Sequence, residues 1–365
     1  MIGTRIKLAR KKAALSLRGL ADALGGKVSA QAIGKYERAE MVPSSRVLIA
    51  LCRALNVSLS YLMDTQGIEL TGVDFRTKAN TTAKDRAHVE TEVIEWIERY
   101  LQIESILELE SREWEEPIHP RPKLQGIEKA EGLADDVREK WKLGRDPIPN
   151  MTELLEEKGL KVFVEELPER VSGLTCLVQR SGNLAELPVV VVNRLFPLER
   201  RRLTLAHELA HRIIDPEVFK KNDTERAATR FAAAFLMPRD HLESEIGKHR
   251  YHLGYQELID LKRLYRVSGA ALLVRLKDIG IIDSSILGYA FQTIARGWRS
   301  QEPEELESQI QRGLREKPCR FERLCYWALA EGLISLVKAA ELLRRPIDKV
   351  EAGLKGPRPA DADHR

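Results

Sequence analysis

Apolar residues recur at helical spacing along most of the chain, and strand-like apolar runs are found in its middle part. Near the N-terminus this spacing predicts five short helices, at residues 2–13, 17–24, 30–38, 47–55 and 59–63. Ser16 and Ser29 are expected N-caps of the second and third helices. Two short helices joined by a glycine-containing turn are typical of a helix-turn-helix, with the third helix as the recognition helix.

Residues 65–125 are predicted to be a helical spacer followed by a Pro-rich linker. Residues 82–113 are strongly charged and carry apolar side chains at helical spacing, which favours a long spacer or dimer-contact helix. A coiled coil is disfavoured because the heptads do not hold for three full repeats. The prolines at 117, 120 and 122 then indicate a semi-rigid linker.

The middle of the chain, residues 126–245, combines both periodicities. Helices are predicted at 127–141 and 151–158, and strands at 161–165, 173–179 and 188–193. Two further helices, at 203–214 and 225–237, would pack against this small sheet. The run from Val189 to Val192 fits either an edge strand, to which an extended peptide could add, or a fully buried central strand.

Residues 246–355 are helical again, and we expect a sensing, docking or dimerisation domain there. Helices are predicted at 257–265, 268–278, 304–315, 319–331, 336–343 and 347–354. The last three resemble a DNA-binding bundle, but the seven basic and five acidic residues of 318–355 do not support strong DNA binding. Residues 356–365 are expected to be a disordered tail. The predicted fold class is therefore mostly α with a small β-sheet in the central domain (α+β).

Composition limits the class of protein. With 365 residues the chain has room for two or three domains. The four cysteines are scattered without a Cys-x-x-Cys pair, which indicates reduced thiols rather than a disulfide framework. The sequence has no run of about 18 apolar residues and no apolar signal core at its start. We therefore expect a soluble, cytoplasmic protein without a membrane partner.

The net charge of +4 hides an asymmetry between the N-terminal module and the rest of the chain. Residues 1–64 hold eleven Lys and Arg against four Asp and Glu, a net charge of +7, which leaves −3 for the remainder. A basic module on a mildly acidic body suggests that only the module binds nucleic acid. The alternative is a small helical docking domain with a solvated basic face.

The most specific chemical signal is the run His207-Glu208-Leu209-Ala210-His211, inside the apolar helix 203–214. Two histidines four residues apart project from one helix face, where both can bind one tetrahedral Zn²⁺. Glu208 is then placed to act as a general base on the attacking water. Because the helix is otherwise apolar, its polar residues need partners, which a metal ion supplies.

A catalytic zinc ion usually takes a third protein ligand, and the next predicted helix offers Glu225. The alanines of this helix allow close packing against the histidine helix. Alternatively, Glu225 only complements the helix dipole. The fallback ligands are Asp215, Glu217 and Asp223.

These motifs together resemble an ImmA/IrrE-type metallopeptidase domain over residues 126–245. The resemblance rests on the run 189–193, the stretch 199–211 and the helix from Glu225 to Pro238. It implies that His207, His211 and Glu225 bind zinc and that Glu208 is the general base. The family often has Asn at the position of Thr229 and Gln or Glu at that of Ala227, which puts the polar surroundings of the metal in doubt.

Residues 1–64 resemble an XRE-type helix-turn-helix, through Leu20-Ala21, Tyr36-Glu37-Arg38 and Pro43-Ser44 among other positions. Leu17 stands where many members have a phosphate-contacting Gln, so Arg18 is expected to replace that contact. The expected DNA-binding residues are Arg18, Ser29, Ala30, Gln31, Lys35 and Arg38. Gln suits adenine, and Lys suits guanine or phosphate.

The sequence thus predicts a DNA-binding regulator with a zinc endopeptidase domain. The resemblance implies that it cleaves a helix-turn-helix repressor, a partner or itself, in response to stress such as DNA damage. The expected partners are a double-stranded operator, the repressor, single-stranded DNA as an activator, and a second copy in a homodimer. Two other interpretations stay open: a regulator whose zinc domain is a sensor or scaffold without turnover, and an antitoxin-like partner of a neighbouring gene.

Overall fold

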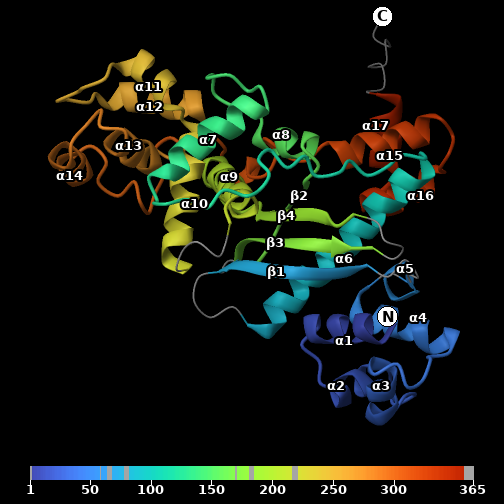
Figure 1. Cartoon of the computed structure of the whole chain (residues 1–365). Helices are drawn as coiled ribbons and strands as arrows, with labels where there is room; N and C mark the ends of the chain where they lie inside the picture. The colour runs from blue at the N-terminus through green and yellow to red at the C-terminus, as the bar shows by residue number, and fades with distance from the viewer. Residues whose placement is uncertain are drawn as a thin grey trace, which may run out of the picture.

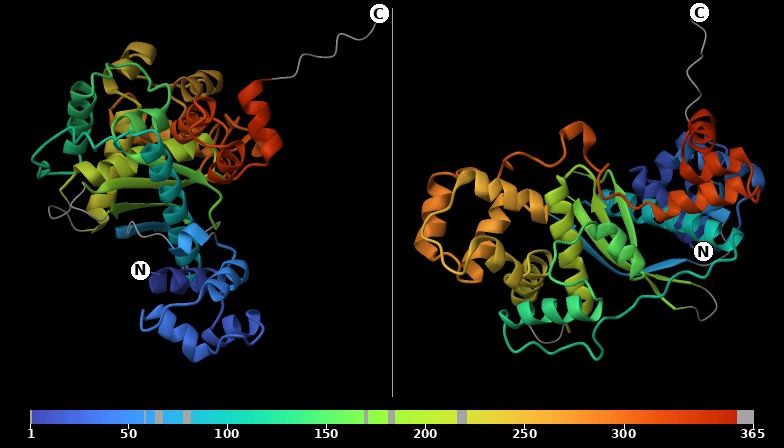
Figure 2. Two further views of the ribbon diagram at one scale, coloured as in Figure 1. Left: turned by 90° about the vertical axis from the view of Figure 1, so that its right-hand side faces the viewer. Right: turned by 90° about the horizontal axis from the view of Figure 1, so that it is seen from above.

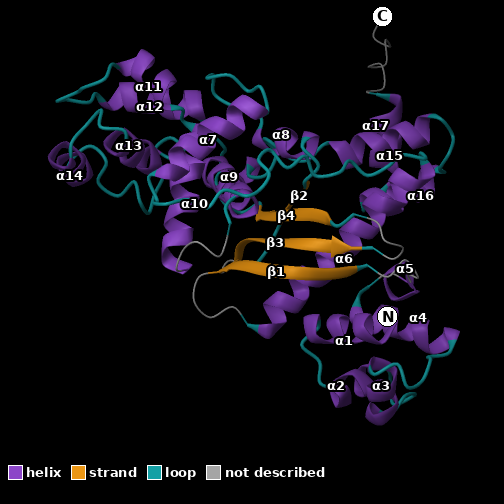
Figure 3. Ribbon diagram, in the orientation of Figure 1, coloured by secondary structure: helices purple, strands orange, loops and turns teal. Residues whose placement is uncertain are grey.

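The computed structural model describes residues 2–57, 59–63, 68–77, 82–168, 171–180, 185–215 and 221–356. The expected tail beyond residue 356 lies outside these residues. The described chain is mostly helical with one four-stranded sheet, as Figure 3 shows, so the predicted fold class is confirmed. No helix within the described ranges is long and apolar enough to cross a membrane.

The N-terminal module consists of five short helices: α1 (Ile2–Lys12), α2 (Leu17–Ala23), α3 (Ala30–Glu37), α4 (Ser45–Leu55) and α5 (Leu59–Met63). Ser16 Oγ accepts a hydrogen bond from the Gly19 amide at 2.9 Å, and Ser29 Oγ accepts one from the Ala32 amide at 3.2 Å. These are the predicted caps of α2 and α3. In Figure 1 the module lies below the sheet, and α2 and α3 lie on the side of the module that is farther from the sheet.

The sheet contains β1 (Glu69–Thr77), β2 (Lys161–Glu165), β3 (Val171–Gln179) and β4 (Leu187–Asn193), in the order β1-β3-β4-β2. β4 runs parallel to β2 and antiparallel to β3, and β3 is antiparallel to β1. The edge-strand interpretation of Val189–Val192 is therefore wrong. All seven residues of β4 are buried, because helices cover both faces of the sheet and a strand flanks β4 on each side.

Helices form a layer on each face of the sheet (Figures 1 and 2). One layer contains α7 (Lys129–Lys140), α8 (Met151–Glu157), α9 (Leu198–Ile213) and α10 (Lys221–Leu236). The other contains α6 (Ala83–Ile106) with α15 (Arg320–Ala330), α16 (Leu336–Leu343) and α17 (Ile347–Lys355). β4 faces both layers, since Val190 and Val192 join the core with α9 while Val189 and Val191 join the core with α6.

The described residues of the segment expected to be a spacer belong to the folded body. The sequence pattern predicts no strand before residue 161, yet β1 pairs with β3 and forms one edge of the sheet. α6 ends at Ile106, short of the predicted residue 113, because Glu108 takes a left-handed conformation with φ of 54°. Val93 and Ile97 of α6 join the core of the sheet, and Ile94 joins the core of the N-terminal module. One helix thus connects the two units.

The remaining helices are α11 (Arg239–Ile246), α12 (Tyr255–Tyr265), α13 (Gly269–Asp278) and α14 (Ser284–Gln292). The predicted helix at 304–315 is wrong: this stretch is irregular apart from one short 3₁₀ turn, Gln309–Gln311. The buried Glu307 carboxylate accepts hydrogen bonds from the amides of Gly313 and Arg315 and from the Arg201 guanidinium. These contacts fold the chain back on Glu307, which a helix does not allow. We call residues 299–317 the strap.

Candidate metal centre and DNA-binding surface

The strap fixes the first turns of α9, the helix that carries the HExxH motif. Arg201 donates to Glu307 Oε2 at 2.7 Å, and their side chains are 3% and 0% exposed. Arg202 pairs with Glu316. Lys262 of α12 donates to Glu199 Oε1 at 2.6 Å, again with both groups buried. Charged groups buried this deeply need partners, so these pairs determine where α9 begins and how it is rotated.

α10 packs closely against α9 because small side chains line its buried face. Ala227, Ala228, Ala232 and Ala234 are all fully buried there. Phe231 and Phe235 fill the core around them. Since Glu225 lies in the first turns of α10, this packing brings its carboxylate over the face of α9 that carries the two histidines.

Within the described part of the chain, His207, His211 and Glu225 form a group of three converging metal-ligand atoms. The two Nε2 atoms are 2.9 Å apart. Glu225 Oε2 lies 3.4 Å from His207 Nε2, and Oε1 lies 3.3 Å from His211 Nε2. Ligand atoms around a tetrahedral zinc ion with bonds of about 2.0–2.1 Å are separated by about 3.3 Å. The donor set of two imidazoles and one carboxylate therefore fits zinc and leaves a fourth position for water or substrate.

The other acidic candidates that the structure describes, Asp215 and Asp223, are not part of this group. Asp223 pairs with Arg226 at 3.4 Å. Asp215 follows the end of α9 and does not belong to the group either. Glu217 lies outside the described residues. The favoured third ligand, Glu225, is thus the one whose carboxylate lies beside both histidines.

Two further residues complete the centre. Glu208 is 3% exposed, directly follows His207 on α9 and is not one of the three converging donors. Thr229 Oγ1 lies 3.3 Å from His207 Nδ1 and donates to the Glu225 backbone carbonyl at 2.8 Å. The sequence marked Thr229 only as a departure from the family pattern. Its i+4 spacing from Glu225 on one helix was the signal that could have placed it at the site.

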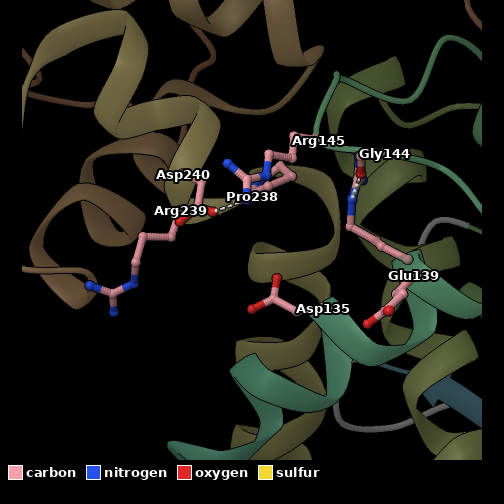
Figure 4. Close-up of a pocket in the computed structure, with 8 residues that line it drawn as sticks. Asp135, Glu139, Gly144, Arg145, Pro238, Arg239 and Asp240 are labelled. Atoms are coloured by element: carbon pink, nitrogen blue, oxygen red, sulfur yellow. Dashed lines mark hydrogen bonds and ion pairs between the residues drawn. The ribbon is translucent and has the colours of Figure 1, made fainter.

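A separate cavity of about 430 Å³ lies between α7 and the start of α11 (Figure 4). Its lining is strongly charged, with Asp135 and Glu139 of α7 facing Arg145 and Asp240. The last two form an ion pair of 3.1 Å. None of the three converging donors lines this cavity, so it is distinct from the candidate metal centre.

The predicted DNA-binding residues lie on one accessible side of the N-terminal module. Arg18, Ser29, Gln31, Lys35 and Arg38 are exposed, and Ala30 is half-buried. On the opposite side of α3, Ile33 and Tyr36 belong to the module's core. The residues expected to face the groove are therefore turned outward.

Two of these side chains have other roles in the free protein. Ser29 Oγ is already used as the cap of α3. Arg38 donates to both carboxylate oxygens of Glu40, at 2.6 and 3.1 Å, and this guanidinium lowers the pKa of the Glu40 carboxyl. In the free protein this pair occupies the Nε and Nη2 groups of Arg38.

The geometry defines a helix-turn-helix module joined to a metallopeptidase-like domain, and comparison with protein families agrees. The helix-turn-helix family model matches residues 6–62. The model of the IrrE N-terminal-like domain, a peptidase family whose members are generally metal-dependent, matches residues 155–277. The chain contains both domains. No curated protein matches the chain.

Proposed function

We propose that the protein is a DNA-binding regulator whose central domain is a zinc endopeptidase that cleaves a helix-turn-helix repressor under stress such as DNA damage. The observation that supports this most strongly is the convergence of His207, His211 and Glu225 beside the buried Glu208. A purely structural metal site has no need of an adjacent general base. This argues against the sensor interpretation.

The residues of the candidate metal centre have separate roles in the proposed peptide hydrolysis. His207, His211 and Glu225 would hold the metal ion, which supplies a Lewis acid for the scissile carbonyl. Glu208 takes a proton from the attacking water and delivers it to the leaving amine. The burial of Glu208 keeps bulk water from competing for its carboxylate.

The proposed substrate is a separate chain or a part of the connector outside α6. The connector between the DNA-binding module and the peptidase domain contains β1 and α6, which are part of the folded body. α6 lies on the face of the sheet opposite α9 (Figure 1). A peptide bond of α6 therefore cannot reach the metal centre of its own chain while the domain stays folded.

The test is to incubate the zinc-loaded protein with helix-turn-helix repressors encoded by neighbouring genes, with and without single-stranded DNA. Fragments are identified by mass spectrometry. Glu208→Gln keeps the size of the side chain but removes the base, so cleavage should fall at least about 10²-fold while metal content stays at one ion per chain. His207→Ala should lose the metal by elemental analysis.

Three results would contradict the proposal. Equal cleavage by the wild type and Glu208→Gln would show that Glu208 is not the general base. If the wild type contains no divalent metal after purification without chelators, His207, His211 and Glu225 do not form a metal centre. Metal binding without cleavage of any tested repressor, in either condition, would favour the sensor.

A further inference from the structure

Another cavity, of about 390 Å³, lies where the DNA-binding module joins the body. Its walls come from α1 of the module and from β1, the residue before it and α6 of the body, which meet there in Figure 1. Leu8 packs against the core of the module, Val73 packs against the core between the sheet and α6, and Leu70 contacts both cores. The cavity therefore lies across the contact between the two units. Its volume is in the range of sites that hold a small organic molecule.

Most of the lining of this cavity is apolar. The apolar side chains are Leu8, Ile68, Leu70, Val73 and Ile94. Ile68 and Ile94 are 6% and 4% exposed, whereas the other three are half-buried and accessible to a ligand. Such a surface favours the apolar part of a ligand, because contact with it removes apolar area from water.

Two carboxylates in the lining have no partner. Glu69 at the start of β1 and Glu90 of α6 form no ion pair or hydrogen bond with the residues that the structure describes. The other four glutamates of α6 each pair with a cation: Glu92 with Lys12, Glu95 with Arg344, Glu98 with Arg5, and Glu104 with Lys161. Glu90 is thus the exception on its helix.

The cations nearest to Glu90 are used elsewhere. Arg86 stands one turn before Glu90 on α6, but its guanidinium lies over the ring of Phe75 at 5.6 Å. Arg5, which also lines the cavity, pairs with Glu98. Burial raises the pKa of the Glu90 carboxyl, and the charges of nearby cations offset this effect only in part. The half-buried carboxylate of Glu90 therefore lacks a cation in direct contact.

We infer that this cavity binds a small organic cation with an apolar body, and that the bound ligand contacts both the DNA-binding module and the body. Its ammonium group pairs with Glu90 and Glu69, and its apolar part covers Leu8, Leu70 and Val73. A charge-assisted contact in a partly buried site is stronger than one in bulk water. The inference depends neither on peptidase activity nor on DNA binding, so it and the proposed function can fail separately.

The test uses the full-length protein and phenylbutylamine, which carries an ammonium group on an apolar body. Phenylbutanol and phenylbutyrate are its uncharged and anionic analogues. The amine should bind with a dissociation constant on the order of 1 mM, as expected for a ligand of its size, in a titration followed by saturation-transfer NMR. The alcohol and the carboxylate should bind at least about 10-fold more weakly, because neither can form an ion pair with Glu90.

Two further measurements locate the bound amine. In methyl-labelled protein its ring protons should show nuclear Overhauser effects to the methyl groups of Leu8 and of Val73, one residue from each unit. Glu90→Gln keeps the shape of the side chain and should weaken the amine at least about 10-fold, while the affinity for the alcohol stays the same. Asp74→Asn is the matched control and should bind the amine like the wild type, since Asp74 is exposed on β1 and does not line the cavity.

Thermal unfolding by circular dichroism checks that the variants are folded. If Glu90→Gln is unfolded, Glu69→Gln replaces it, because Glu69 is exposed, and it should weaken the amine about 3-fold. Equal affinities for the amine, the alcohol and the carboxylate would overturn the inference. The same holds for a folded Glu90→Gln that binds the amine like the wild type, for an amine without contacts to both Leu8 and Val73, and for a wild type that binds no amine at about 10 mM.

Discussion

At the scale of single residues, Thr229 determines how His207 presents its ring to a metal. The single hydroxyl proton of Thr229 is used on the Glu225 carbonyl, so its oxygen accepts from the Nδ1–H of His207. This hydrogen bond leaves Nε2 unprotonated and directed at the other two donors.

Thr229→Val removes the hydroxyl with little change in volume, so it tests this contact directly. We expect the affinity for zinc to fall about 10- to 100-fold, which is the usual effect of losing a group that orients a histidine ligand. The measurement is competition with a chromophoric chelator at constant pH. Thr229→Ser retains the hydroxyl and should retain most of the affinity. Equal affinity of the Val variant and the wild type would show that Thr229 has no orienting role.

At the scale of helices and strands, the sequence predicted those features that depend on residues close together in the chain. The caps Ser16 and Ser29, and the histidine pair on α9, depend on residues a few positions apart, so the sequence displays them. β1 is stabilised instead by β3, about 100 residues later, and Gly72 with φ of 57° interrupts its alternation at a bulge. No pattern within residues 69–77 identifies that partner.

The strap illustrates the same limit. Its charged residues have the spacing of an amphipathic helix, which is why a helix was predicted at 304–315. The irregular course depends on Arg201, 106 positions away, whose charge needs a buried carboxylate. The ligand Glu225 was predictable because a helix so rich in alanine can approach α9 closely. The sequence already favoured Glu225 over Asp223, which in the structure pairs with Arg226.

Glu307→Ala should destabilise the protein because it leaves Arg201 buried without its carboxylate. Removing one partner of a buried pair typically costs about 3–5 kcal/mol. The control is Glu305→Ala, which removes a neighbouring partner of Arg312 that is 28% exposed and should cost at most about 1 kcal/mol. Urea unfolding of both metal-loaded variants measures the difference. If the two variants are equally stable, the strap does not hold α9.

At the scale of the whole molecule, α6 joins the DNA-binding module, the sheet and the C-terminal helices. Its acidic residues form ion pairs with basic residues of the module: Glu92 pairs with Lys12, and Glu98 pairs with Arg5. Part of the module's net charge of +7 is thus neutralised inside the chain. The exposed face of α3 points away from the body and keeps its own polar and basic groups (Figure 1).

This division of charge predicts which cations bind DNA. Arg18 is exposed and forms no ion pair with the described residues, so it is available for a phosphate, whereas Lys12 is held by Glu92. Each phosphate contact contributes about 0.9 to the slope of log K against log salt concentration. Arg18→Ala should therefore reduce the slope, measured by fluorescence anisotropy on a duplex from the protein's own promoter, by about 1. Lys12→Ala should leave it unchanged.

Gln31→Ala separates base recognition from phosphate binding. It should leave the salt slope intact and lower the preference for one base pair by about 1–3 kcal/mol, because Gln recognises an adenine edge and carries no charge. The measurement is competition between the promoter duplex and versions with single base-pair changes. A salt slope reduced by Lys12→Ala to the same extent as by Arg18→Ala would mean that DNA displaces Glu92 from Lys12. The module would then turn away from α6 when it binds DNA.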